Sequence, residues 1–80
     1  MELKRFYKTQ REVAEVINFL VDSYWADKLT EETLVDVVWK LHNDNPGKVV
    51  KMFDFTTVLK QKCGKRRLDV IARILNLSLQ

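Results

Sequence analysis

The sequence predicts an all-α protein, a compact bundle of about four short helices that ends in a helix-turn-helix-like hairpin. Three observations support this fold class. Apolar residues recur at helical spacing, threonines stand where helices would begin, and the 80 residues include only two glycines and one proline. With 46% hydrophobic and 31% charged residues, the composition is that of a folded chain. Because 80 residues are the size of one compact unit, residues 1–80 are expected to form a single helical domain.

The first helix is expected from about Gln10 to Ala26. Thr9 and Glu12 have the spacing of a capping box, in which two side chains satisfy backbone N–H groups at a helix start. Apolar residues then recur at i, i+4, i+7 and i+11, which places them on one helix face. These residues are Val13, Ile17, Leu20 and Tyr24.

The second helix is expected over residues 31–43. Thr30 is its candidate N-cap, and Glu31 and Glu32 stand in the first turn, where the helix dipole favours negative charge. Residues 43–47 follow, with the sequence Asn-Asp-Asn-Pro-Gly, and predict a turn. Residues 48–53 predict a helical turn or an irregular connection, because a lone strand there would lack a pairing partner.

Two further short helices are expected in the C-terminal part. Asp54 or Thr56 could cap a third helix that reaches about Lys62, and Cys63-Gly64 would end it. Residues 65–77 predict a fourth helix, whose apolar residues recur at i, i+3 and i+7. These are Leu68, Ile71 and Leu75. A glycine turn between two short helices is typical of a helix-turn-helix hairpin.

Positive charge is concentrated in the C-terminal part. Residues 1–47 contain six Lys or Arg and nine Asp or Glu, whereas residues 48–80 contain eight and two. The last predicted helix opens with three basic residues, where a helix-turn-helix protein contacts phosphates or base edges. This asymmetry indicates an anionic partner, either nucleic acid or an acidic protein. The candidate contacts are Lys60, Lys62, Lys65, Arg66, Arg67 and Arg73.

Apolar residues are more numerous than one face of each helix can bury. In the second predicted helix, one face carries Leu34, Val38 and Leu41. Another face carries Val35 and Trp39. Either this helix is central and surrounded, or its second face binds a protein or another copy of the chain, since aromatic residues are enriched at interfaces. The candidate interface residues are Trp25, Val35, Trp39, Val70, Ile74 and Leu77.

The residue types that carry catalysis or bind metals are scarce. His42 is the single histidine and Cys63 the single cysteine, so one chain cannot supply the usual ligands of a zinc site. Lys62 and Lys65 flank Cys63, an environment that can lower a thiol pKa, but no second cysteine or neighbouring base suggests a mechanism. We therefore expect a protein that is not an enzyme, with no catalytic residue, no bound metal and no cofactor.

Cysteine usage and hydropathy bear on location. A small secreted domain usually carries several cysteines, so a single one favours a reducing cytoplasm. No stretch has the length and hydrophobicity of a signal peptide or of a membrane span. A cytoplasmic protein without membrane association is expected.

Three segments carry a family resemblance. Ser23-Tyr24-Trp25 ends the first helix, Leu34-Val35 lies in the second, and residues 60–68 read Lys-Gln-Lys-Cys-Gly-Lys-Arg-Arg-Leu. Over about residues 17–75 the chain resembles small proteins of Firmicutes and their mobile elements, including the TscA-type antitoxins. The resemblance implies a protein that neutralises a partner, such as a toxin antagonist or a phage-encoded inhibitor.

These observations favour a small binding protein that neutralises or regulates a protein partner. Trp25 and Trp39 would serve as anchors, while the basic residues would steer an acidic partner into place. The alternative is a small DNA-binding transcriptional regulator, or an RNA-binding protein, that uses the same basic hairpin against phosphates. Self-association through the apolar residues remains a further use of that surface.

Overall fold

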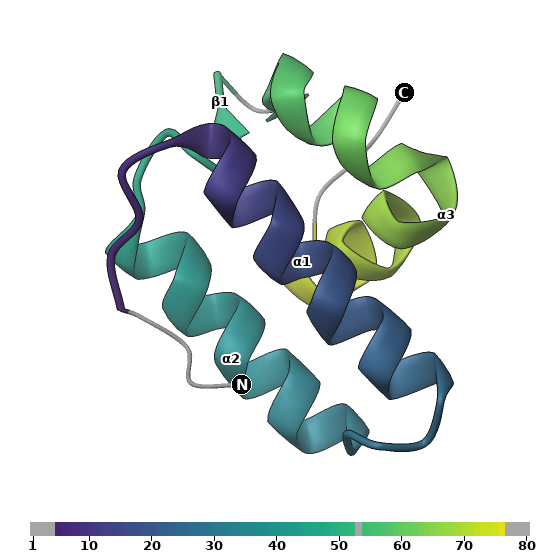
Figure 1. Ribbon diagram of the computed structural model, residues 1–80. Coiled ribbons are helices and arrows are strands. Elements are labelled where there is room, and N and C mark those ends of the chain that lie inside the picture. The colour runs from purple at the N-terminus through teal and green to yellow at the C-terminus, as the bar shows by residue number, and fades with distance from the viewer. Residues whose placement is uncertain (1–4, 53, 77–80) are drawn as a thin grey trace.

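The computed structural model describes residues 5–52 and 54–76. These residues form three helices and a small two-stranded antiparallel sheet. The elements are α1 (Gln10–Trp25), α2 (Glu31–Asp44), β1 (Val50–Lys51), β2 (Asp54–Phe55) and α3 (Thr57–Leu75). Figure 1 shows α1 and α2 running in opposite directions, and α1 packs against both other helices. The expected helical character is confirmed, whereas the all-α class is corrected to a mostly helical fold with a small sheet.

Each helix begins at a threonine that caps it. The Thr9 hydroxyl accepts a hydrogen bond from the Glu12 N–H at 3.1 Å, and it donates one to the Glu12 carboxylate at 3.3 Å. Thr30 and Thr56 accept equivalent bonds at 3.2 and 3.3 Å from the N–H three residues later. Because a side-chain oxygen there satisfies an N–H without an intrahelical acceptor, local sequence was enough to predict the first two starts. For the third, the sequence left Asp54 and Thr56 as alternatives, and the structure has Thr56.

Val50–Lys51 form a strand, which corrects part of the expectation of a helical turn or an irregular connection for residues 48–53. Phe53 lies outside the described residues. Val50 pairs with Phe55 and Lys51 with Asp54, and the Thr56 N–H donates to the Val49 carbonyl oxygen at 3.2 Å. The partner strand that seemed to be missing lies only two residues further along the chain. Asp54, which the sequence offers as a possible helix cap, begins this partner strand.

The expectation of four helices is wrong, because the two predicted C-terminal helices form one bent element. Gly64 has φ of 79° and ψ of 167°, which is not helical, yet the helix continues on both sides of it. Figure 1 shows that the two arms of α3 run in clearly different directions. A single glycine thus bends the helix where a turn of about three residues had been predicted. The second arm ends at Leu75, and Asn76 takes the left-handed conformation of a helix C-cap.

Two side chains hydrogen-bond to backbone carbonyl groups beside this bend. Asn18 of α1 donates from Nδ2 to the Lys62 carbonyl oxygen at 3.1 Å, and Arg67 donates from Nη1 to the Cys63 carbonyl oxygen at 3.2 Å. The bend is therefore held partly by α1, which lies far from it in the sequence.

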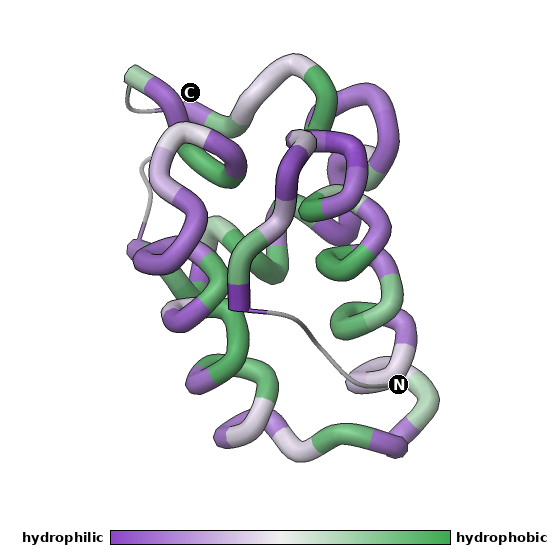
Figure 2. The backbone as a smooth tube through the Cα atoms, turned by 60° about the vertical axis from the view of Figure 1, so that its left-hand side comes forward, coloured by the Kyte–Doolittle hydropathy of each residue, from purple (hydrophilic) through white to green (hydrophobic). Residues whose placement is uncertain are grey.

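The core draws residues from all three helices. Ile17, Leu20, Leu34, Leu59 and Ile71 are among its largest fully buried side chains. In Figure 2 the hydrophobic segments of the helices lie mainly on the sides that face a neighbouring helix. The apolar faces predicted from helical spacing, including those of the second arm of α3, are confirmed as core.

Asn45 fastens the N-terminal segment to the end of α2. Its side chain is buried, with 1% exposure. Its Oδ1 accepts a hydrogen bond from the Tyr7 N–H at 2.8 Å. Its Nδ2 donates to the Arg5 and Leu41 carbonyl oxygens at 3.1 and 3.0 Å. Because a buried amide with these bonds joins residues about 40 positions apart, Asn45 is a tertiary link as well as a turn residue.

Candidate functional site

A groove lies where the end of α1, the start of α2 and the second arm of α3 meet. Its volume is about 350 Å³. It is lined by Tyr24, Trp25, Glu31, Leu34, Val70, Arg73 and Ile74. We call this surface the Trp25 groove.

Three candidate interface residues come together in the Trp25 groove. Trp25 is the last residue of α1 and is 49% exposed. Val70 and Ile74 are both half-buried and stand one helical turn apart on α3, so they present a continuous apolar strip. Leu34 forms part of the buried wall behind them. The lining of the groove is therefore largely apolar and includes a large, partly exposed aromatic ring.

The other three candidate interface residues do not line this groove. Val35 is half-buried and Trp39 is 38% exposed, so α2 is not the fully surrounded helix that one interpretation of the sequence required. The Trp39 ring meets the His42 ring edge-on, with centroids 6.0 Å apart. Leu77 lies outside the described residues.

Three residues of the Trp25 groove are not among the candidates that the sequence predicts. Helical spacing places Tyr24 and Leu34 on core faces, and Glu31 stands in the first turn of a helix. A signal for the groove was present, because only five residues separate Trp25 from Glu31. So short a connection requires the end of α1 and the start of α2 to lie close together.

Two of the six candidate basic contacts are engaged within the chain. Arg67 binds Asp22 through Nε–Oδ1 and Nη2–Oδ2 contacts, both 2.9 Å long. The hydrogen bonds that Arg67 donates to Asp22 raise the pKa of Arg67. Lys60 pairs with Asp54, and that bond lowers the pKa of the Asp54 carboxyl group. A partner would therefore have to compete with a carboxylate for each of these two cations.

The remaining four basic candidates have no such partner in the described residues. Lys62, Lys65, Arg66 and Arg73 are all exposed, and no described carboxylate forms an ion pair with any of them. Lys62 and Lys65 flank the bend at Gly64, while Arg73 lines the Trp25 groove. If α3 meets an anionic partner, these four side chains are the ones available to it.

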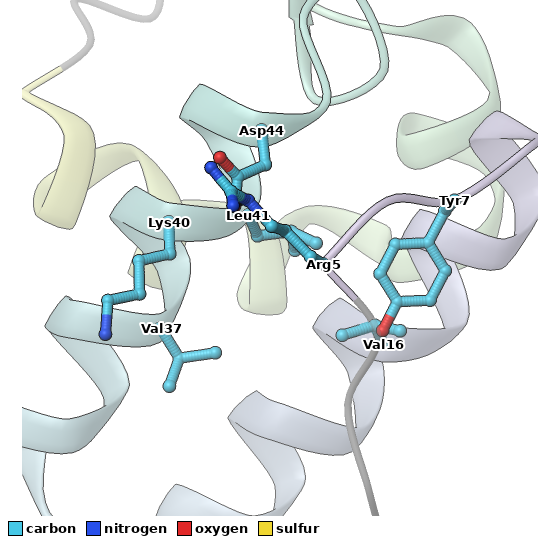
Figure 3. Close-up of a pocket in the computed structure, with 7 residues that line it drawn as sticks. All are labelled: Arg5, Tyr7, Val16, Val37, Lys40, Leu41 and Asp44. Carbon is cyan, nitrogen blue, oxygen red and sulfur yellow. The ribbon is translucent and has the colours of Figure 1, made fainter.

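A second pocket of about 430 Å³ lies under the N-terminal segment, against α1 and α2. Figure 3 shows the Tyr7 ring beside Val16, with Val37 and Lys40 across the pocket. Its charged side chains are already paired, since Arg5 meets Asp44 at 3.2 Å and Lys40 meets Asp36 at 3.1 Å. This pocket is larger than the Trp25 groove but offers a partner fewer unengaged groups.

The thiol of Cys63 is buried, and burial has a larger effect on its pKa than the lysine neighbours that could have lowered it. The Sγ atom donates to the Ala14 carbonyl oxygen at 3.6 Å, and the side chain points into the core rather than toward solvent. Burial raises the pKa of Cys63 to about 11, and the charge of Arg67 offsets this only in part. A protonated, buried thiol is a poor nucleophile.

Thiol labelling tests whether Cys63 is buried and protonated in the folded chain. At pH 8 a pKa near 11 leaves a thiolate fraction about two orders of magnitude below that of a free cysteine. Reaction of the folded chain with a disulfide reagent is therefore expected to be at least that much slower than reaction in denaturant. Because the thiol pKa is higher in the folded state, stability is also expected to fall as the pH rises between about 9 and 11. Equal labelling rates in the folded and denatured states would contradict this assignment.

The described residues contain no group of three or more His, Cys, Asp or Glu side chains placed to hold a metal ion. Within the same residues, none of the helices has both the length and the hydrophobicity needed to span a bilayer.

Comparison with known proteins returns one family. A family model described as "Conserved hypothetical protein" matches residues 4–76, which include every described residue of the groove and of the bend. No curated protein and no solved structure gives a significant match.

Proposed function

This chain belongs to the conserved hypothetical protein family whose model covers residues 4–76, and we propose that it is a non-catalytic binding protein that regulates or neutralises a protein partner. In this proposal the partner inserts an apolar side chain into the Trp25 groove. The antitoxin or inhibitor role implied by the resemblance to TscA-type antitoxins is one form of such neutralisation.

The observation that carries the proposal is the convergence of Trp25, Val70 and Ile74 in one groove. Partly exposed aromatic residues beside an apolar depression are typical of the centre of protein interfaces, where a few residues supply most of the binding energy. Arg73 at the same site can form a charge-assisted hydrogen bond with a carboxylate of the partner. The basic surface of α3 would also accelerate the approach of an acidic protein.

Affinity capture from a lysate of the native host tests the proposal, with the tagged chain used at moderate and at high salt. Trp25→Ala removes the exposed ring from the groove. Phe19→Ala is the matched control, because Phe19 is a similarly exposed aromatic residue on the same helix, at 43%, and does not line the groove. A stoichiometric protein retained at high salt by the wild type and by Phe19→Ala, with at least about tenfold weaker binding to Trp25→Ala, is the expected result.

Two outcomes would count against the proposal. A protein that binds Trp25→Ala as tightly as the wild type would place the interface elsewhere. Recovery of nucleic acid alone, lost as salt rises, would favour the alternative function.

That alternative is a small nucleic-acid-binding regulator. It is favoured by the four exposed cations of α3 that no described carboxylate engages, Lys62, Lys65, Arg66 and Arg73. If all four contact phosphates of duplex DNA, the logarithm of the binding constant should fall with the logarithm of salt concentration with a slope of about −3.6. Each Ala substitution among them would reduce that slope by about 0.9.

A further inference from the structure

The Trp25 groove carries opposite charges on different elements. Glu31 begins α2, and Arg73 lies in the last turn of α3. The two side chains do not form an ion pair with each other, and neither pairs with another described residue. Val70 and Ile74 line the groove beside Arg73 on α3, and Trp25 lines it from the end of α1. The lining of the groove is therefore largely apolar, with an acidic residue on α2 and a basic residue on α3.

We propose that a second copy of this chain occupies the groove, in a symmetric dimer in which Arg73 of each copy faces Glu31 of the other. A two-fold axis that runs between the α2 and α3 walls of the groove exchanges the two walls. Such an axis brings the cation of one copy opposite the anion of the other, and does so twice. A purely acidic or purely basic ligand would meet one favourable and one unfavourable charge, whereas a second copy satisfies both.

The apolar centre supports the same occupant. Trp25 is 49% exposed in the single chain, and Val70 and Ile74 are covered only in part. In a two-fold dimer the apolar strip of one copy lies against that of the other, so water is excluded from both at once. The two charge pairs would then set the orientation in which the copies meet.

The proposed dimer uses the same surface as the proposed function, and it rests on that function in one respect: a partner must displace the second copy. The free chain is a dimer, and a partner protein that enters the groove displaces the second copy. The dimer and the capture of a protein partner can be tested independently, because the mass of the purified chain is measured without any partner. A monomer that still captures a protein through Trp25 would end the dimer proposal alone. A dimer that captures nothing would end the proposed function alone.

Sedimentation equilibrium of the purified chain, at concentrations from about 1 to about 500 µM, tests the dimer with charge-reversal variants. Arg73→Glu makes the groove wholly acidic, and Glu31→Arg makes it wholly basic. Each variant alone is expected to weaken dimerisation by more than about tenfold, because one substitution turns both charge pairs into repulsions. An equimolar mixture of the two variants, and the double variant with both changes, should again form dimers.

Two controls change the same charges away from the groove. Glu32→Arg alters the neighbouring residue in the first turn of α2, and Lys65→Glu alters an exposed cation of α3 that does not line the groove. Both controls should dimerise like the wild type, and circular dichroism should show that every variant is folded. A wild-type chain that is monomeric throughout would overturn the proposal. So would a dimer insensitive to the two reversals, or single variants that fail to recombine.

Discussion

Replacing Asn45 with alanine is expected to lower the melting temperature by about 10–15 °C. The substitution removes the acceptor of the Tyr7 N–H and the donor to the Arg5 and Leu41 carbonyl oxygens. Unsatisfied buried polar groups cost about 1–3 kcal/mol each, which is a large share of the stability of an 80-residue domain. Thermal unfolding followed by circular dichroism measures the loss.

Hydrogen exchange at single amides distinguishes the loss of the Asn45 hydrogen bonds from a general loss of packing. In the Asn45→Ala variant, hydrogen exchange of the Tyr7 amide should accelerate more than exchange in the centres of α1 and α3. Asn43→Ala is the matched control, because Asn43 lies in the last turn of α2, two residues before Asn45, and is exposed. Tyr7 protection that survives in Asn45→Ala would contradict the assigned hydrogen bond.

The Asn45→Asp variant adds a pH signature. An aspartate retains an acceptor for the Tyr7 N–H but turns a carboxylate oxygen toward two carbonyl groups. Burial and these acceptors should raise the pKa of that carboxyl group above its value in the unfolded chain. Because the protonated form can donate, the variant should recover stability as pH falls through the raised pKa, and lose it as pH rises. A stability difference from the wild type that does not change between pH 4 and pH 7 would contradict this account.

Replacing Gly64 with alanine is expected to destabilise the fold by about 1–3 kcal/mol. Its φ of 79° and ψ of 167° lie in a region that is essentially restricted to glycine. No atom stands within 4 Å of the position of an added Cβ, so the cost arises from the backbone and not from a clash with a neighbour. The alternative, a return to helical angles, would straighten α3 and pull Leu68 and Ile71 away from the core.

Gln61→Ala serves as the control for this prediction, because Gln61 is exposed on the first arm of the same helix. Its effect should stay within about 0.5 kcal/mol. Urea unfolding of both variants provides the comparison. A Gly64→Ala variant as stable as the wild type would show that the bend is not strained for an L-residue.

The sequence by itself determined where α1 and α2 begin, narrowed the start of α3 to a cap at Asp54 or Thr56, and indicated which helix faces are buried. Thr9, Thr30 and Thr56 act on N–H groups three residues away, and helical periodicity selects the buried side chains, so both signals are local. Local signals also located the break at Gly64, although they could not tell a bend within one helix from a turn between two helices. The strand at residues 50–51 was missed because its recognition required the pairing with Asp54–Phe55 to be considered.

Only the tertiary structure decided which charged and polar residues are left for a partner. Lys60 and Arg67 look the same in sequence as Lys62 and Arg66, yet Arg67 is bound to Asp22, 45 positions away. The meeting of Trp25 with Val70 and Ile74, the hydrogen bonds of Asn45 to the N-terminal segment and the burial of Cys63 likewise join parts of the chain that are distant in sequence. Composition and spacing report which groups a chain possesses. Which elements pack together decides whether a side chain is bound within the chain or is available to a partner. This packing is a property of the folded chain as a whole.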